Sequence, residues 1–172
     1  MNNKNAKQNI KYLIYLLISV IILVVLDQWT KKLAVLYLKD KAPFVLIDGV
    51  FELTYLENRG AAFGLFQNQR MIFLLITLAV MAVILYVYWK LPKTRRFLPL
   101  RLIGAGILAG AAGNMIDRLF YGYVVDFFYF RLIDFPVFNV ADIYVTVSAF
   151  MMVILLIFYY KEDEFKFNSA VQ

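Results

Sequence analysis

The sequence predicts an integral membrane protein of the mainly α class, with four transmembrane helices, a small extracytoplasmic β-sheet and an amphipathic interfacial helix. Of its 172 residues, 63% are hydrophobic and only 17% are charged, whereas about 25% of the residues in soluble domains are charged. Four apolar stretches are long enough to cross a bilayer, which takes roughly 20 helical residues. The length allows little beyond these spans, so we expect a single membrane-embedded domain over residues 1–172.

The positions of the spans follow from the apolar stretches. The polar segment 27–31 comes after the first stretch, where a signal peptide would have small residues for cleavage, so we expect a retained anchor helix. In the third stretch, Gly106 and Gly110 form a small-xxx-small pair that allows a neighbouring helix to approach closely. The expected spans are residues 12–29, 71–89, 97–116 and 138–160.

The distribution of cations predicts the orientation of these spans. Residues 90–101, between the second and third spans, include five Lys or Arg and no acidic residue, and the N-terminal tail adds three lysines. Positively charged loops remain in the cytoplasm, so we expect both tails there and segments 27–70 and 117–137 on the outer side. The net charge of +6 is not gathered in one stripe, so it indicates topology control and not nucleic-acid binding.

The first outward segment contains signals for a helix and a hairpin. Residues 31–38 have the helical spacing of an amphipathic helix lying at the membrane surface. The β-prone runs 44–47 and 50–56 are separated by Asp48 and Gly49, a strong hairpin signal. Residues 123–130 can add a further extended piece to the same sheet.

Asp126 and Asp142 are the candidate catalytic residues. The chain has no histidine and no cysteine, which removes the usual general base, thiolate nucleophiles and cysteine-bound zinc. A carboxylate close to the hydrocarbon core is costly and is a functional candidate by default. If the outward loop folds back, the two can meet, and one of a close pair then keeps its proton. The charged member can deprotonate a water while the protonated member activates a peptide carbonyl, as in aspartic proteases.

Other polar residues near this pair also have structural interpretations. An ion pair with the adjacent Arg118 is the favoured interpretation of Asp117, and Asp27 can equally cap or anchor its helix or act near the site. Asn139 can cap the fourth span. Two aspartates and an asparagine could bind magnesium, but nothing in their spacing requires a metal.

Two other classes of protein remain open at this point. A small proton-coupled transporter would use the aspartates as a proton relay, and it predicts carboxylates at mid-membrane on several spans. A non-catalytic assembly factor would use the polar residues to tie helices together, and it predicts that Asp126→Asn or Asp142→Asn preserves function.

Five polar motifs resemble those of the bacterial lipoprotein signal peptidases (signal peptidase II). The resemblance covers roughly residues 10–160 and implies an intramembrane aspartic protease. The implied reaction removes the signal peptide of diacylglyceryl-modified prolipoproteins just before the lipidated cysteine, at the outer face of the cytoplasmic membrane. The motifs, in the order of the family, are VLDQ at 25–28, ENRGAAF at 57–63, GNMIDR at 113–118, VVDF at 124–127 and FNVAD at 138–142.

The resemblance also implies roles for individual residues. It places the catalytic dyad at Asp126 and Asp142, and Asn58 with the glycine-alanine run after it resembles the part of an outward loop that closes over substrate. Glycine permits hinge motion, so Gly60 and Gly64 are candidate hinges of this loop. The implied partners are prolipoproteins and membrane lipids, without cofactor, metal or nucleic acid, and one chain carries every motif, so we expect a functional monomer. Residues expected to bind substrate or support the dyad are Asp27, Asn58, Gly60, Asn114, Asp117, Arg118 and Asn139.

Overall fold

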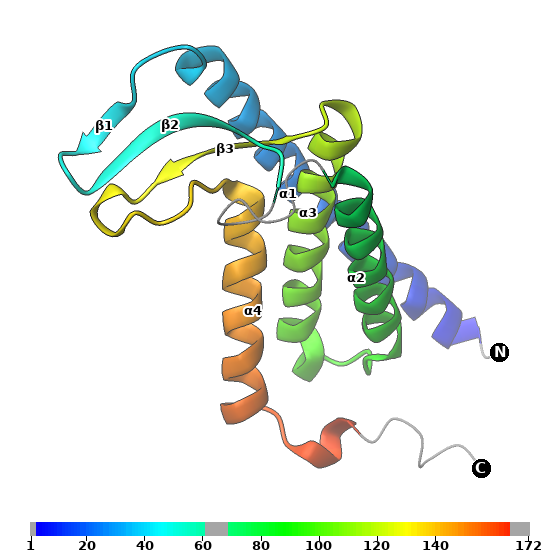
Figure 1. Cartoon of the computed structure of the whole chain (residues 1–172). Helices are drawn as coiled ribbons and strands as arrows, with labels where there is room; N and C mark the ends of the chain where they lie inside the picture. The colour runs from blue at the N-terminus through cyan, green and yellow to red at the C-terminus, as the bar shows by residue number, and fades with distance from the viewer. Residues whose placement is uncertain (1–2, 61–68, 166–172) are drawn as a thin grey trace.

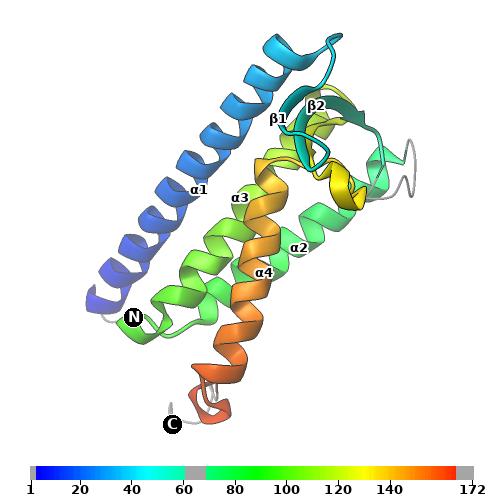
Figure 2. The same cartoon turned by 90° about the vertical axis from the view of Figure 1, so that its left-hand side faces the viewer.

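Four long helices and a three-stranded sheet make up the protein. A computed structural model describes residues 3–60 and 69–165, with side chains from residue 7 onward. Each long helix is long and apolar enough to cross a membrane, and the sheet lies over the end of the bundle where α1 ends and α4 begins (Figures 1 and 2). The protein is therefore a multi-pass membrane protein of the expected fold class. The helices are α1 (Asn3–Leu38), α2 (Arg70–Lys90), α3 (Leu98–Phe120) and α4 (Val140–Phe158).

α3 is the central helix of the bundle. It packs against α1, α2 and α4, and residues 103–110 are all buried. Gly106 and Gly110 face α4, where a methyl group on Gly106 would collide with Ser148 and one on Gly110 with the backbone of Ala141. The predicted close approach at this glycine pair is therefore confirmed, and it brings the start of α4 against α3.

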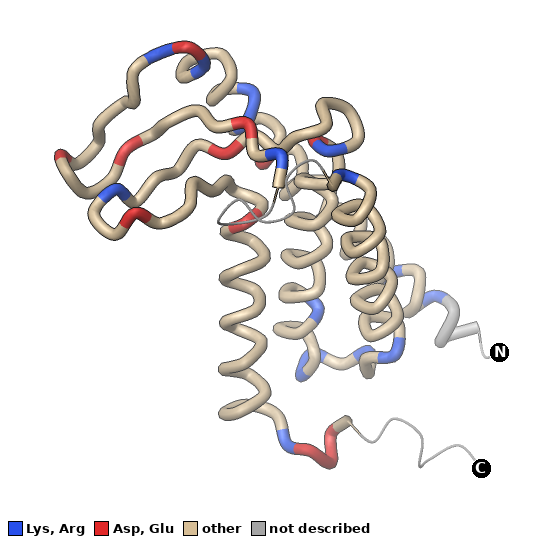
Figure 3. The backbone as a smooth tube through the Cα atoms, viewed as in Figure 1, with Lys and Arg blue, Asp and Glu red and all other residues tan. Residues whose placement is uncertain are grey.

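The outer surfaces of the other three helices are apolar. Ile21 on α1, Val83 on α2 and Phe150 on α4 are all more than half exposed, a pattern that suits contact with lipid rather than water. Lys, Arg, Asp and Glu gather mainly at the two ends of the bundle, and the middle of the helices carries few of them (Figure 3).

α1 is longer than the expected first span. Residues 31–38 are helical, as expected for the interfacial helix, but they continue α1 without a break. No proline or glycine interrupts this stretch, and Ala34 and Leu38 are buried against Val125 and Phe127 of the sheet. The last turns of α1 therefore support the sheet from below.

The sheet confirms the predicted hairpin and its third strand. Gly49 adopts a positive φ of 68° in the turn, which glycine tolerates without strain. In the antiparallel pairing of β2 with β3, Leu56 lies opposite Asp126 and Asn58 opposite Val124. Residues far apart in the chain are thus brought to one end of the sheet. The strands are β1 (Phe44–Ile47), β2 (Phe51–Asn58) and β3 (Val124–Tyr129), in the order β1-β2-β3.

α4 begins two residues later than the expected span. Phe138 forms a β-bridge with Phe128, so the backbone is still extended at this position, and the helix starts at Val140. This short extended segment passes directly beneath β3. The start of α4 is thereby held against the strand that carries Asp126.

Candidate active site

Asp126 and Asp142 lie in the wall of one cavity beneath the sheet. Asp126 is in β3 and is 1% exposed, while Asp142 is in the first turn of α4. The cavity measures about 480 Å³, and both carboxylates line it together with Asn58, Asn114 and Arg118. The outward loop therefore folds back so that both carboxylates face the same space. Their place at one end of the bundle differs from the mid-membrane positions that a proton-relay transporter predicts.

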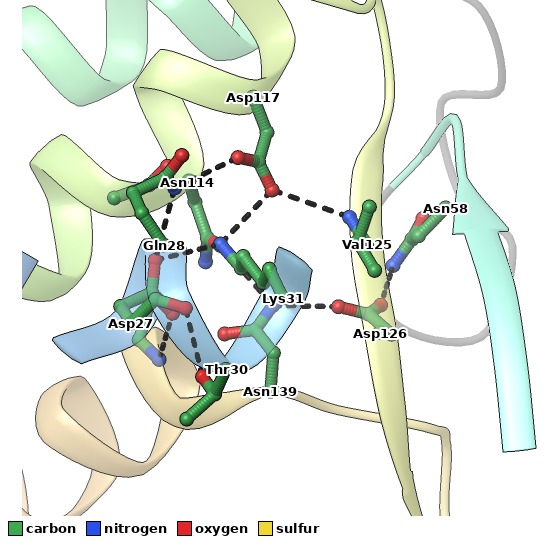
Figure 4. Close-up of polar contacts among 12 residues, drawn as sticks. Asp27, Gln28, Thr30, Lys31, Asn58, Asn114, Asp117, Val125, Asp126 and Asn139 are labelled. Atoms are coloured by element: carbon green, nitrogen blue, oxygen red, sulfur yellow. Dashed lines mark hydrogen bonds and ion pairs between the residues drawn. The ribbon is translucent and has the colours of Figure 1, made fainter. Parts of the chain in front are cut away.

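Four amide donors surround the two carboxylates, and Figure 4 shows Asn58 and Asn139 beside Asp126. The side-chain amides of Asn58 and Asn139 donate to Asp126, with N–O distances of 2.8 and 2.6 Å. Asp142 accepts a hydrogen bond of 2.8 Å from Asn114 Nδ2 and one of 3.1 Å from the backbone N–H of Asn139. Asn139 thus contacts both members of the pair and fixes their relative position.

Asn139 is also the N-cap of α4, as predicted. Its Oδ1 accepts a hydrogen bond from the backbone N–H of Asp142, and the Asp142 carboxylate accepts one from the backbone N–H of Asn139. This reciprocal capping box satisfies two backbone donors at the start of the helix. The cap therefore fixes the rotamer of Asp142. The other carboxylate oxygen of Asp142, Oδ1, accepts the hydrogen bond from Asn114.

Burial and the second carboxylate change the acidity of Asp126. Desolvation, followed by repulsion from Asp142, raises the pKa of Asp126 from its ordinary value of 3.8 to about 7. Hydrogen bonds from Asn58 and Asn139 oppose this rise but do not cancel it. Below neutral pH, Asp126 therefore carries a proton that it can donate.

Asp27 and Asp117 form ion pairs with Lys31, a residue that the sequence did not single out. The Nζ of Lys31 lies 3.0 Å from Asp27 Oδ2 and 3.0 Å from Asp117 Oδ2. The favoured pairing of Asp117 with Arg118 was wrong, because adjacent residues on a helix point about 100° apart. The i, i+4 spacing of Asp27 and Lys31 on one helix was the feature of the sequence that could have predicted their ion pair.

Arg118 instead joins the outward loop to the cavity. Its guanidinium donates to the carbonyl oxygen of Gly60, stacks on the ring of Phe73 and lines the cavity. The backbone N–H of Gly60 donates to Asn58 Oδ1, so the beginning of the loop is bonded to two residues of the site. Residues 61–63 of the loop motif and the expected hinge Gly64 lie outside the described residues.

Gln28 and Gly113 are further parts of the site that the sequence analysis did not assign individually. Gln28 Nε2 donates to Asp117 Oδ1 at 2.8 Å and to the carbonyl of Gly113 at 3.2 Å. A side chain on Gly113 would occupy the position of the Asp27 carboxylate. Glycine at this position therefore lets α1 and α3 approach closely enough for the ion pairs to form.

The remaining wall of the cavity is mostly apolar. Carboxylates and amides thus share one cavity with apolar side chains, an arrangement that can hold an apolar chain with one peptide bond beside the acid pair. Within residues 3–60 and 69–165, no group of three His, Cys, Asp or Glu side chains is placed to hold a metal ion. The apolar lining comes from residues 135–138 and from Ile143 and Val147 of α4.

Comparison with known proteins shows the family to which the chain belongs. A family model described as "Signal peptidase (SPase) II" matches residues 19–158. The chain is 46% identical to a lipoprotein signal peptidase of Caldanaerobacter subterraneus subsp. tengcongensis, over 83% of this chain and 95% of that protein. It is 43% identical to a lipoprotein signal peptidase of Clostridioides difficile, over 86% and 97%.

The fold has solved counterparts as well. A bacterial membrane enzyme solved at 2.3 Å superimposes with a TM-score of 0.72 and 26% identity, covering 92% of this chain and 93% of that one. A second such enzyme, solved at 1.9 Å, gives a TM-score of 0.71 and 28% identity over 85% of this chain. A family match over most of the length, close relatives and a shared architecture lead to one conclusion: the chain belongs to the signal peptidase II family and is a membrane peptidase.

Proposed function

We propose that this protein is an aspartic endopeptidase that removes the signal peptide from diacylglyceryl-modified prolipoproteins. The observation that carries the proposal is the pair Asp126 and Asp142, of which Asp126 is buried and Asp142 half-buried, in the wall of one cavity and bridged by Asn139. Relatives that are 46% and 43% identical are lipoprotein signal peptidases, which supports the same substrate class for this chain.

The shape of the cavity suits a lipid-anchored substrate. Its apolar lining can contact the hydrophobic signal helix while the acyl chains remain in the bilayer. The dyad lies at the end of the bundle opposite the cation-rich segment 90–101, and that segment belongs in the cytoplasm by the positive-inside rule. We therefore assign both chain ends to the cytoplasmic side, cleavage to the outer face of the membrane, and the cut to the bond before the lipidated cysteine.

Asp142 and Asp126 take different parts in the reaction. Asp142 is the base: it removes a proton from a water whose oxygen then bonds to the scissile carbonyl carbon. Asp126 is the acid, because it holds a proton near neutral pH and gives that proton to the carbonyl oxygen. The C–N bond then breaks as the proton on Asp142 passes to the leaving nitrogen, and Asp126 recovers its proton from a hydroxyl of the intermediate.

Neighbouring groups support this chemistry from the cavity wall. Asn58 and Asn139 hold Asp126, and Asn114 and the helix cap hold Asp142. Arg118 places a positive charge beside the cavity, where it can attract a substrate carbonyl or the developing oxyanion. Every one of these groups comes from one chain, so the enzyme acts as a monomer in contact with membrane lipids, without a metal or cofactor.

Cleavage of a diacylglyceryl prolipoprotein by purified protein in lipid vesicles tests the proposal. Wild type should cut the substrate, and Asp126→Asn and Asp142→Asn should each lose cleavage while keeping the thermal stability of wild type. Substantial cleavage by either variant would remove that residue from catalysis. No cleavage by the wild type would overturn the assigned substrate.

A further inference from the structure

Lys31 is a buried cation that does not itself line the cavity, yet hydrogen bonds connect it to both members of the dyad. Its side chain is 4% exposed, and its ammonium has three protons for three acceptors. Two acceptors are Asp27 and Asp117, and the third is Asn114 Oδ1 at 2.8 Å. Lysine can only donate, so this contact forces the oxygen of the Asn114 amide toward Lys31.

The consequence of that contact reaches both aspartates. With its oxygen held by Lys31, Asn114 must turn its NH₂ group toward Asp142, to which it donates at 2.8 Å. The same oxygen accepts a hydrogen bond from Asn139 Nδ2, and that nitrogen also donates to Asp126. One ammonium group therefore orients the two amides that face the two carboxylates.

The carboxylate partners of Lys31 act on the dyad in a parallel way. Asp117 Oδ2 accepts the backbone N–H of Val125, the residue before Asp126. Asp27 Oδ1 accepts the backbone N–H of Ala141, the residue before Asp142. Each dyad residue is thus preceded by a backbone group fixed to a carboxylate that Lys31 neutralises, and Figure 4 shows this for Asp117 and Val125.

We propose that Lys31 is a positioning residue that sets the geometry and charge of the catalytic pair. The inference rests on the proposed peptidase function and adds a residue that touches no substrate. The buried carboxylates of Asp27 and Asp117 cannot both stay ionised without this cation. Loss of Lys31 therefore disturbs the backbone N–H groups that these carboxylates hold and frees the Asn114 amide to rotate.

The test compares Lys31→Met with Lys32→Met, a neighbour that is exposed on the same helix. We expect Lys31→Met to lower kcat about 100-fold with little change in KM, since small misplacements of catalytic groups cost that much. Lys32→Met removes the same charge from the helix and should cleave like wild type. A wild-type kcat in Lys31→Met would overturn the proposal.

A double variant separates positioning from folding. Lys31→Met with Asp117→Asn removes one charge of each sign, so it should recover the thermal stability that Lys31→Met loses. Its kcat should stay low, because no cation then orients Asn114. Recovery of kcat along with stability would show that Lys31 acts only on the fold and would refute the positioning role.

A measurement without substrate tests the role of Lys31 independently of the proposed cleavage. The charged groups around Asp126 are Asp142 on α4, Lys31 on α1 and Arg118 on α3, and the charge of Lys31 lowers the pKa of Asp126. In Lys31→Met, the infrared band of the protonated Asp126 carboxyl should therefore persist to higher pH than in wild type. The Asp126→Asn variant identifies the band, and an unchanged titration in Lys31→Met would contradict the proposal even if wild type cleaves.

Discussion

At the scale of single residues, the acid–base properties of the two carboxylates depend on the groups that surround them. Asp126 is buried, faces Asp142 and accepts two amide hydrogen bonds. The sequence could identify this residue because its neighbours Val124 and Phe127 are apolar. It could not identify Lys31 as the partner of Asp117, because that contact joins α1 to α3 across 86 residues of chain.

The raised pKa of Asp126 predicts the alkaline side of the pH profile. Because its pKa is about 7, the carboxyl is protonated below pH 7 and loses its proton above it. If Asp126 is the acid, kcat/KM, which depends on the free enzyme, should fall about tenfold for each pH unit well above 7. Initial rates on a prolipoprotein between pH 5 and 9 would measure this, and a flat profile up to pH 9 would contradict the assignment.

Asn139 caps α4 and donates a hydrogen bond to Asp126, and substitutions can separate these two roles. Serine caps a helix about as well as asparagine, but its short hydroxyl cannot reach Asp126. Asn139→Ser should therefore keep nearly wild-type stability and lose most cleavage, while Asn139→Ala should lose cleavage and also about 1 kcal/mol of stability. Thermal unfolding and kcat measured on both proteins would check this, and full activity in the serine variant would exclude a role for the amide.

At the scale of elements, the position of α4 depends on the small residues of α3. The sequence predicted a close helix contact here, because the spacing of Gly106 and Gly110 puts both on one helix face, but it did not predict that α4 makes the contact. The sequence also predicted the hairpin, because Asp48 and Gly49 suit a tight turn. It did not predict that α1 runs on to Leu38, because the last turns are held by burial against the sheet rather than by local signals.

Two glycines of α3 should respond differently to the same substitution. In Gly110→Ala the new methyl group meets the backbone of Ala141, whereas in Gly104→Ala it lies at an ordinary 3.5 Å from the ring of Tyr88. We expect Gly110→Ala to cost about 1–3 kcal/mol by overpacking and to displace Asp142, reducing cleavage. Gly104→Ala is the control and should change neither stability nor rate. Equal stability of the two variants would argue against the packing at α4.

At the scale of the whole molecule, charge decides which end of the bundle faces the outside. The cations of residues 90–101 and the sheet lie at opposite ends of the bundle (Figure 3). If the cations face the cytoplasm, the sheet therefore faces the outside. Composition alone predicted a membrane protein, and loop charge predicted its orientation. The register that brings Asn58 to Asp126 could not be predicted, because it arises from pairing between β2 and β3 across a long stretch of chain.

The lack of cysteine makes the orientation directly measurable. Any cysteine introduced into this chain is its only thiol, and Asp48 in the hairpin turn and Thr94 in the cation-rich loop are both exposed. A membrane-impermeant maleimide should label Asp48→Cys from outside right-side-out vesicles and Thr94→Cys only after permeabilisation. The reverse pattern would invert the topology and move cleavage to the cytoplasmic side.

The length of α1 couples its tilt to the thickness of the bilayer. Its 36 residues make a rod of about 54 Å, longer than the roughly 30 Å of a hydrocarbon core. Such a helix fits a thinner or thicker bilayer by changing its tilt. One end of this rod contacts the cation-rich segment 90–101, and the other carries Lys31 and the residues that support the sheet. We therefore expect a change of bilayer thickness to act through α1 on the residues around Asp126 and Asp142, so that the fatty-acid composition of the membrane influences cleavage.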